Sequence, residues 1–213
     1  MMKLVVIDYG MGNLHSVSKA VEHVAPAGCT VTVTDDATRI AEADRVLLPG
    51  QGAARDCMAA IDEHGLREPI ARALTSKPFL GICMGLQVLL DHSAENGGIN
   101  CLGHFSGDVL AFAHDLLDPA NGESLCVPAM GWNPVFQSEH PLWAGIADGE
   151  HFYYAHSYYV KPLDKQLVVG ESEYPERFAC ALARDNVFAC QFHPEKSASQ
   201  GLQLLKNFVN WSI

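Results

Sequence analysis

Cys83 stands in a setting that suits a nucleophile, because Gly81 lies two residues before it and Gly85 two residues after it. The apolar segment 78–82 predicts a strand, and segment 84–92 predicts a helix. A tight strand-to-helix turn strains its central residue and presents the side chain beside the N–H groups of the helix N-terminus. The pattern indicates either a thiolate nucleophile or a buried structural cysteine between two turn glycines.

A base for this thiol is offered by His193, which Pro194 and Glu195 follow. Proline disfavours the helical conformation for the residue before it, so we expect His193 to be extended. Residues i and i+2 of an extended segment share a face, and a carboxylate there can fix the tautomer of the ring and stabilise its cation. A His-Pro dipeptide is more often a plain surface turn. The predicted strand 187–192 ends here, however, and the two motifs at strand ends together indicate a cysteine hydrolase or acyl transferase.

A second glycine pair, Gly50 and Gly52, flanks Gln51 after the predicted strand 45–48. Glycines allow backbone N–H groups to approach a ligand closely, so this loop and the N–H of Met84 are candidates for an oxyanion hole. An ordinary strand-ending turn is the alternative interpretation of the loop.

The elements that must position these residues alternate between strand and helix in the first half of the chain. Further predicted strands are 3–8 and 29–34, and further predicted helices are 14–24 and 53–74, the latter broken near Gly65 and Pro69. From about 101 to 187 the signals become strand-rich, and a helix over 201–211 closes the chain. We expect an α/β three-layer sandwich with a central, mostly parallel sheet and a strand-rich second half, forming a single domain over residues 1–213.

Composition excludes several classes of protein. The chain has 213 residues, 48% of them hydrophobic, and a net charge of −11 without a basic stripe, which weighs against nucleic-acid binding. No apolar run approaches the length of a membrane span and no signal peptide precedes the first strand, so a cytoplasmic location is expected. The seven cysteines form no close CxxC pair. They favour reduced thiols, and neither a metal nor a cofactor is expected.

The motifs together resemble the triad-type (class I) glutamine amidotransferases. Segments 81–87 and 192–195 carry the resemblance to the family. Within it, the chain is similar to the glutaminase subunits of imidazole glycerol phosphate synthase in histidine biosynthesis. The signals of that subfamily follow one another along nearly the whole chain, at 8–14, 48–53, 130–133, 156–158 and 193–197.

The resemblance implies a role for each residue of the triad. Cys83 would attack the side-chain amide of glutamine, releasing ammonia and leaving a glutamyl thioester that water hydrolyses to glutamate. His193 would act as base and then as acid, with Glu195 orienting it. The oxyanion hole would combine the loop 50–52 with the N–H of Met84.

The resemblance also implies substrate contacts. Gln87 lies one helical turn beyond Cys83 and would help to bind L-glutamine. Backbone groups at His156, Ser157 and Tyr158 would do the same. The alternatives are an ordinary polar helix residue for Gln87 and a plain strand for the other three.

Three residues match family positions at a partner interface: Asn13, Trp132 and Lys196. The partner implied is the (β/α)8-barrel cyclase subunit, which would form a heterodimer with this chain. It would use the ammonia to make imidazole glycerol phosphate and aminoimidazole carboxamide ribotide. Trp132 could instead belong to the core. Cys126 and Ala129 depart from the Lys and His expected there, which puts local substrate or interface contacts near Ala129 in doubt.

Three alternatives remain open on the sequence. The first is a glutaminase subunit that serves another pathway, and the second a hydrolase of γ-glutamyl peptides that needs no partner. The third is a dinucleotide- or ligand-binding module with a structural Cys83. Gly10 and Gly12 follow the first strand, but His15 replaces the third glycine of the dinucleotide motif.

Overall fold

A 12-stranded mixed sheet forms the centre of the computed structural model, which describes residues 2–113 and 115–213. Five adjacent strands, in the order β2-β1-β3-β4-β14, are parallel. Their bounds are Thr30–Thr34 (β2), Lys3–Ile7 (β1), Arg45–Leu48 (β3), Phe79–Ile82 (β4) and Val187–Cys190 (β14). The carboxyl ends of β3, β4 and β14 therefore lie side by side, and the three candidate motifs follow these ends.

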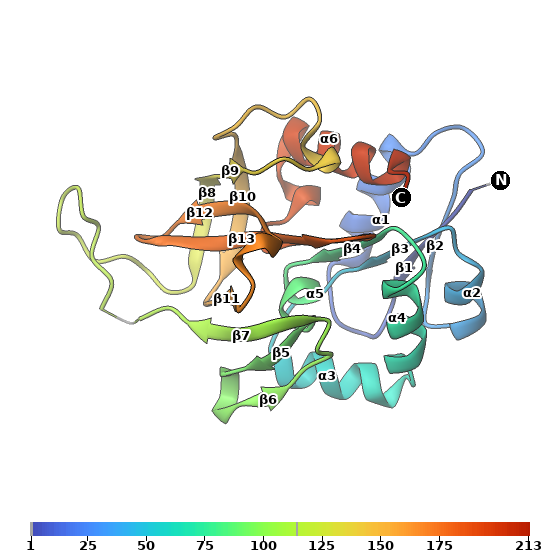
Figure 1. The fold of residues 1–213 in the computed structure, drawn as a ribbon, viewed down its shortest axis with the longest axis horizontal. Coiled ribbons are helices and arrows are strands. Elements are labelled where there is room, and N and C mark those ends of the chain that lie inside the picture. The colour runs from blue at the N-terminus through green and yellow to red at the C-terminus, as the bar shows by residue number, and fades with distance from the viewer. Residues whose placement is uncertain (1, 114) are drawn as a thin grey trace.

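Helices cover both faces of the parallel strands, as Figure 1 shows. In β1, Leu4 and Val6 point into one core and Val5 and Ile7 into the other. Helices α1 and α6 pack in the first core, and α2, α3 and α4 in the second. Their bounds are Leu14–Val24 (α1), Ala198–Asn210 (α6), Ala37–Glu42 (α2), Ala54–Glu63 (α3) and Arg67–Leu74 (α4). The predicted three-layer sandwich is confirmed.

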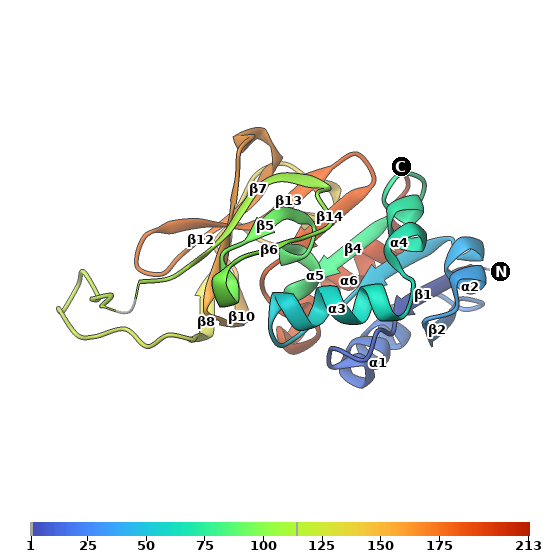
Figure 2. The ribbon, with the colours of Figure 1, turned by 90° about the horizontal axis from the view of Figure 1, so that it is seen from below.

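The second half of the chain adds strands to this sheet, and Figure 2 shows them beside the helix-covered part. From β14 the order continues β13-β11-β7-β5-β6, with β12 beside β13 and β9 beside β12, and β8 and β10 form a separate two-stranded sheet. Their bounds are β5 Leu90–Ser93, β6 Ile99–Asn100, β7 Phe105–Ala111, β8 Ala129–Pro134, β9 Phe136–Gln137, β10 His151–His156, β11 Tyr158–Pro162, β12 Val168–Glu173 and β13 Arg177–Arg184. The strand-rich second half is thus confirmed. One sheet runs through both halves, while the single domain over 1–213 stays a prediction.

The predicted helix 84–92 is wrong beyond Gln87. Helix α5 spans only Met84–Gln87, and β5 begins at Leu90, where it pairs with β7. A short apolar run fits a buried helix or a buried strand equally well, and pairing with β7 decides between them. The break near Gly65 is confirmed at φ +65, whereas Pro69 lies in the first turn of α4, where no helical hydrogen bond is lost. The short helix α2 was not predicted.

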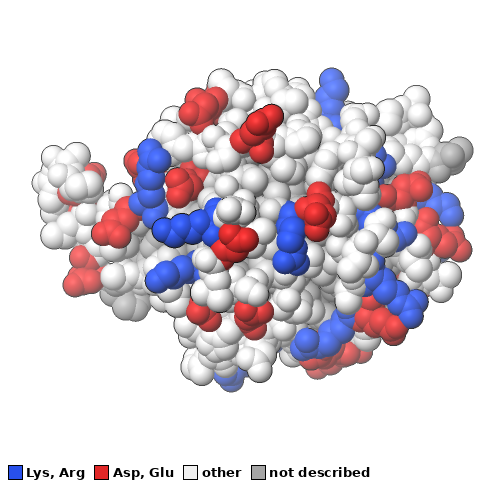
Figure 3. All heavy atoms as spheres, viewed as in Figure 1, with Lys and Arg blue, Asp and Glu red and all other residues white. Residues whose placement is uncertain are grey.

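The charge of the surface is mixed. Figure 3 shows Lys and Arg side chains interspersed with Asp and Glu on the face seen there. None of the helices in residues 2–113 and 115–213 combines the length and the apolar character needed to cross a membrane. The cytoplasmic location stays a prediction.

Helix α5 lies so close to the carboxyl ends of β3 and β4 that only glycine fits at positions 81 and 85. A Cβ atom on Gly85 would overlap the carbonyl oxygen of Leu48, and one on Gly81 would lie 2.6 Å from the carbonyl oxygen of Gly85. Backbone contact is therefore the physical reason for the glycine spacing around Cys83.

We expect Gly85→Ala to lower the free energy of unfolding by about 3 kcal/mol, because the added methyl group meets a backbone oxygen that cannot move alone. Urea unfolding measures this change. Gly28→Ala is the control: Gly28 has a positive φ, +86, which Gly85 does not have, and open space around it, so only the backbone strain of about 1 kcal/mol is expected. An equal loss of unfolding free energy in the two variants would contradict the close contact between Gly85 and the backbone of Leu48.

Candidate active site

Cys83 occupies the predicted strand-to-helix turn, with a backbone conformation of φ 56 and ψ −108. This conformation is strained for any residue but glycine. The N–H of Cys83 donates to the carbonyl oxygen of Cys190 at 2.8 Å, which ties the turn to the end of β14. Cys83 directly precedes Met84, the first residue of α5, so its sulfur lies at a helix N-terminus.

His193 and Glu195 form a buried pair after β14. The Nδ1 atom of His193 lies 2.9 Å from Oε1 of Glu195, and their side chains are 10% and 1% exposed. Because a carboxylate only accepts, Nδ1–H donates and Nε2 is left for the Cys83 sulfur. The backbone is fixed as well: the N–H of His193 donates to the carbonyl of Tyr153 at 2.9 Å, and the Ser197 hydroxyl donates to the carbonyl of His193 at 2.6 Å.

The electrostatics of this pair favour a charged imidazole. Burial alone would lower the pKa of His193, but hydrogen bonds to Cys83 and Glu195 and the negative charge of both partners raise it to about 10. The pKa in the fold exceeds the ordinary 6.5, so the pairing stabilises the protein fully below pH 6.5. That contribution is lost as the pH rises through about 10. At neutral pH the proton therefore stays on the ring.

The loop 50–52 reaches the same pocket from β3. Gln51 and Gly52 line the pocket with Cys83 and Met84. Gly50 does not line it, and a Cβ atom on Gly50 would lie 2.4 Å from the Tyr9 hydroxyl oxygen. The Tyr9 hydroxyl donates to the carbonyl of Pro49 at 2.9 Å, and the Cys57 thiol donates to the carbonyl of Gln51 at 3.4 Å. These bonds anchor the residue before the loop and the carbonyl of its central residue.

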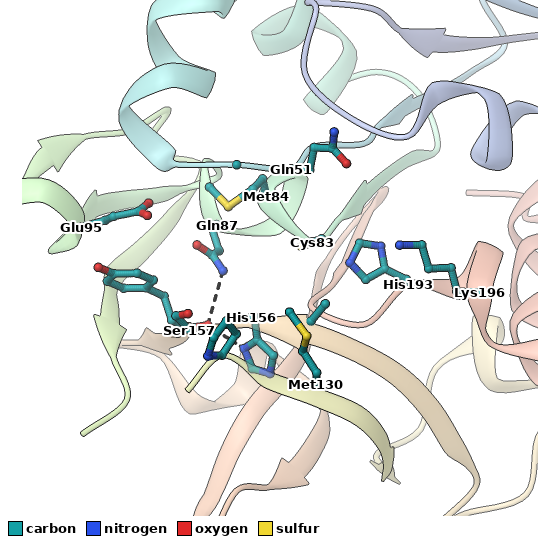
Figure 4. A pocket seen from close by; sticks show the side chains of 14 residues that line it. Gln51, Cys83, Met84, Gln87, Glu95, Met130, His156, Ser157, His193 and Lys196 are labelled. Atoms are coloured by element: carbon teal, nitrogen blue, oxygen red, sulfur yellow. Dashed lines mark hydrogen bonds between the residues drawn. The ribbon is translucent and has the colours of Figure 1, made fainter. Parts of the chain in front are cut away.

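The pocket has a volume of about 250 Å³ and also contains the four predicted substrate residues, Gln87, His156, Ser157 and Tyr158. In Figure 4 the amide of Gln87 points towards the segment that carries Ser157 and His156. Nε2 of Gln87 donates to Oε1 of Gln191 at 2.9 Å and to the carbonyl of Tyr158 at 3.4 Å. Its Oε1 is buried and has no partner among the described residues. Gln87 is therefore not an ordinary surface position of a helix.

His156 is neutral in this pocket. Burial lowers its pKa to about 4, against the opposing effect of its hydrogen bond to the Tyr158 carbonyl. Nδ1 of His156 donates to that carbonyl at 2.7 Å, so Nε2 carries a lone pair. The described residues contain no group of three or more His, Cys, Asp or Glu side chains that could hold a metal ion.

Two residues of the site were missed by the sequence analysis, Glu95 and Gln191. Glu95 lines the pocket, and its Oε2 accepts the N–H of Ala54 at 2.6 Å, which caps α3. Gln191 is fully buried, and its Nε2 lies 3.6 Å from the Cys83 sulfur. Gln191 was hidden inside a predicted strand, and Glu95 lies in a short turn, Glu95–Gly97, with no pattern of its own.

The predicted partner residues occupy two different settings. Trp132 is 49% exposed, so it is not a core residue, and its ring packs against Tyr153 at 6.1 Å. Nζ of Lys196 lies 5.8 Å from the same tyrosine ring, and Lys196 lines the pocket. Asn13 caps α1 by accepting the N–H of Ser16 at 3.3 Å. A role of these residues in partner binding stays a prediction.

A family model described as glutamine amidotransferase class-I matches residues 5–211. The chain belongs to the class-I glutamine amidotransferases. This amidotransferase is 59% identical over 210 residues to a protein of Thiobacillus denitrificans named "Imidazole glycerol phosphate synthase subunit HisH", covering 98% of this chain and 91% of the relative. A protein of the same name from Dechloromonas aromatica is 57% identical, with coverages of 98% and 96%.

Solved structures share the fold of this amidotransferase. PurLQS from Thermotoga maritima superposes with a TM-score of 0.72 at 18% identity, covering 98% of each chain. A second structure, titled "Crystal structure of glutamine amidotransferase", gives a TM-score of 0.70 at 14% identity, with 97% of each chain covered. At these identities the likeness concerns the fold alone.

Glu195→Gln should lower the pKa of His193 by about 1 to 3 pH units, because the amide keeps the size of the side chain but removes its negative charge. An NMR titration of the imidazole signals measures the change. Glu68→Gln is the control, since Glu68 is 73% exposed and pairs with Arg72 on α4. An unchanged titration of His193 in Glu195→Gln would show that the carboxylate does not hold the proton on the ring.

Proposed function

We propose that this class-I amidotransferase hydrolyses L-glutamine and delivers the ammonia to a separate cyclase subunit in histidine biosynthesis. The observation that carries the proposal is that Cys83 and His193 line one pocket and that Glu195 is hydrogen-bonded to the ring of His193. The pathway is supported by the relatives at 59% and 57% identity, which are named subunits of imidazole glycerol phosphate synthase.

The reaction begins from the thiolate of Cys83 and the imidazolium of His193. The Cys83 sulfur attacks the side-chain amide carbon of glutamine, and His193 gives its proton to the leaving nitrogen, so that the carbon–nitrogen bond breaks and ammonia departs. Water then attacks the thioester while His193 takes a proton from it. Glutamate leaves and the thiolate–imidazolium pair is restored.

The developing oxyanion is bound by backbone N–H groups. The N–H of Met84 is free of the helical hydrogen bonds of α5 because it lies at the first position of the helix. The loop 50–52 contributes the second N–H. Rotation of the Gln51 peptide, flanked by Gly50 and Gly52, brings this group towards the oxyanion when the partner binds.

The substrate amino acid is held by polar groups on the opposite side of the pocket. Oε1 of Gln87 is a buried acceptor without a partner among the described residues, which suits the α-ammonium group of glutamine. Glu95 adds a negative charge on the same wall. Backbone groups of the segment 156–158 complete the contacts with the substrate.

The cyclase barrel binds beside the pocket mouth. Met130 lines the pocket and is 68% exposed, and Trp132 is 49% exposed two residues further along β8. Exposed large apolar residues next to a site mark a protein interface. Such an interface shields the ammonia, which would be protonated in bulk water, on its way to the (β/α)8 barrel.

Cys83→Ala should reduce ammonia release from glutamine by on the order of 10³-fold or more, because no nucleophile remains. The measurement compares wild type and variant, each with and without the cyclase subunit. Cys29→Ala is the control, since Cys29 is a free, partly buried thiol far from the pocket. Retained activity in Cys83→Ala, or failure of the wild-type gene to restore growth of a histidine-requiring strain that lacks this subunit, would contradict the proposal.

Trp132→Ala should weaken binding of the cyclase subunit by about 2 kcal/mol, or about 30-fold in Kd, because aromatic residues dominate interface energies. Isothermal titration calorimetry measures the affinity. The Trp132→Ala substitution should also reduce the rise in glutamine turnover that the partner and its nucleotide ligand cause. Leu163→Ala is the control, because Leu163 is 76% exposed and follows the far end of β11. If the cyclase subunit bound the wild type and Trp132→Ala with equal affinity, the interface would not include Trp132.

A further inference from the structure

Gln191 is a fully buried polar side chain that the mechanism above does not use. The nitrogen and the oxygen of its side-chain amide contact two different residues of the site. Nε2 lies 3.6 Å from the Cys83 sulfur, and Oε1 accepts from Nε2 of Gln87 at 2.9 Å. The side chain thus lies between the nucleophile and a residue proposed to bind the substrate.

The direction of each hydrogen bond in the series that links Cys83, Gln191 and Gln87 follows from a single backbone carbonyl. The carbonyl oxygen of Tyr158 can only accept, so the Gln87 atom 3.4 Å from it must be the NH2 nitrogen. That nitrogen carries a second hydrogen, which needs an acceptor, and Oε1 of Gln191 supplies one. The other end of Gln191 is then its NH2 group, which points at the sulfur of Cys83.

The backbone of Gln191 is held in place by the sheet. It directly follows β14, and its N–H donates to the carbonyl of Cys180 in β13 at 2.8 Å. The preceding residue, Cys190, accepts the N–H of Cys83 at 2.8 Å. The donor therefore approaches the sulfur from a rigid element, which is how an active-site group is kept in register.

We propose that Gln191 is a positioning residue: it directs an N–H donor at the Cys83 sulfur and fixes the amide of Gln87 with its oxygen towards the substrate. The proposal rests on the proposed function, because it takes Cys83 as the nucleophile and Gln87 as a substrate contact. A donor next to sulfur stabilises the thiolate more than the thiol, because hydrogen bonds to charged groups are the stronger ones. Loss of Gln191 therefore affects both reactivity and substrate binding.

The test uses Gln191→Met, which keeps the length of the side chain and removes both the donor and the acceptor. The rate of Cys83 alkylation by iodoacetamide, followed by peptide mass spectrometry, should reach half its maximum about one pH unit higher than in the wild type. The KM for glutamine should rise about tenfold, because Gln87 loses the partner that orients it. Gln87→Met should also raise the KM, because the proposed substrate contact is lost.

Asn186→Leu is the matched control for loss of a buried amide. Asn186 lies before β14, at the opposite end of the strand, and donates to the carbonyls of Leu74 and Lys77. This variant should lose stability without changing the alkylation midpoint or the KM. If Gln191→Met does not fold, as judged by circular dichroism, Gln191→Glu replaces it. Its carboxylate next to the sulfur should raise the alkylation midpoint by at least one pH unit.

In the folded variant, an unchanged pH midpoint of alkylation together with a KM within about twofold of wild type would overturn the proposal. A change in only one of the two would overturn it as well. Alkylation by iodoacetamide does not require glutamine hydrolysis. An unchanged profile in a protein that still releases ammonia therefore rejects the role of Gln191 and leaves the proposed function standing. If the wild type released no ammonia from glutamine, the proposed function would be rejected instead.

Discussion

The backbone of Cys83 is held at φ 56, a conformation that L-residues avoid, and the placement of the surrounding groups depends on it. The strain costs about 1–2 kcal/mol. A hydrogen bond to the carbonyl of Cys190 and the close contact between Gly85 and the end of β3 hold the turn in place. The same turn brings the sulfur to the N-terminus of α5, at the pocket that His193 also lines.

The order of the strands brings distant segments together at this turn. β4 lies between β3 and β14, so the loops that follow these three strands share one edge of the sheet. The loop 50–52, Cys83 and the His193–Glu195 pair are far apart in sequence but meet at this edge. The antiparallel strands of the second half add the wall formed by His156, Ser157 and Tyr158.

Local chemistry explains which parts of this arrangement the sequence predicts. Glycine spacing marks Cys83 and a proline-restricted extended segment marks His193, and both patterns depend on neighbours in the chain. Gln191 and Glu95 were missed because their partners come from remote segments, as the bond of Glu95 to Ala54 shows. The wrong helix boundary after Gln87 has the same origin, since pairing with β6 and β7 defines β5.

Detection of the covalent intermediate tests most directly the claim that Cys83 is the nucleophile. Protein quenched in acid during turnover of glutamine should carry one glutamyl group, and peptide mapping should place it on Cys83. The adduct should be absent from protein quenched without glutamine. A glutamyl group on another residue, or ammonia release with no adduct on Cys83 at any quench time, would contradict the account.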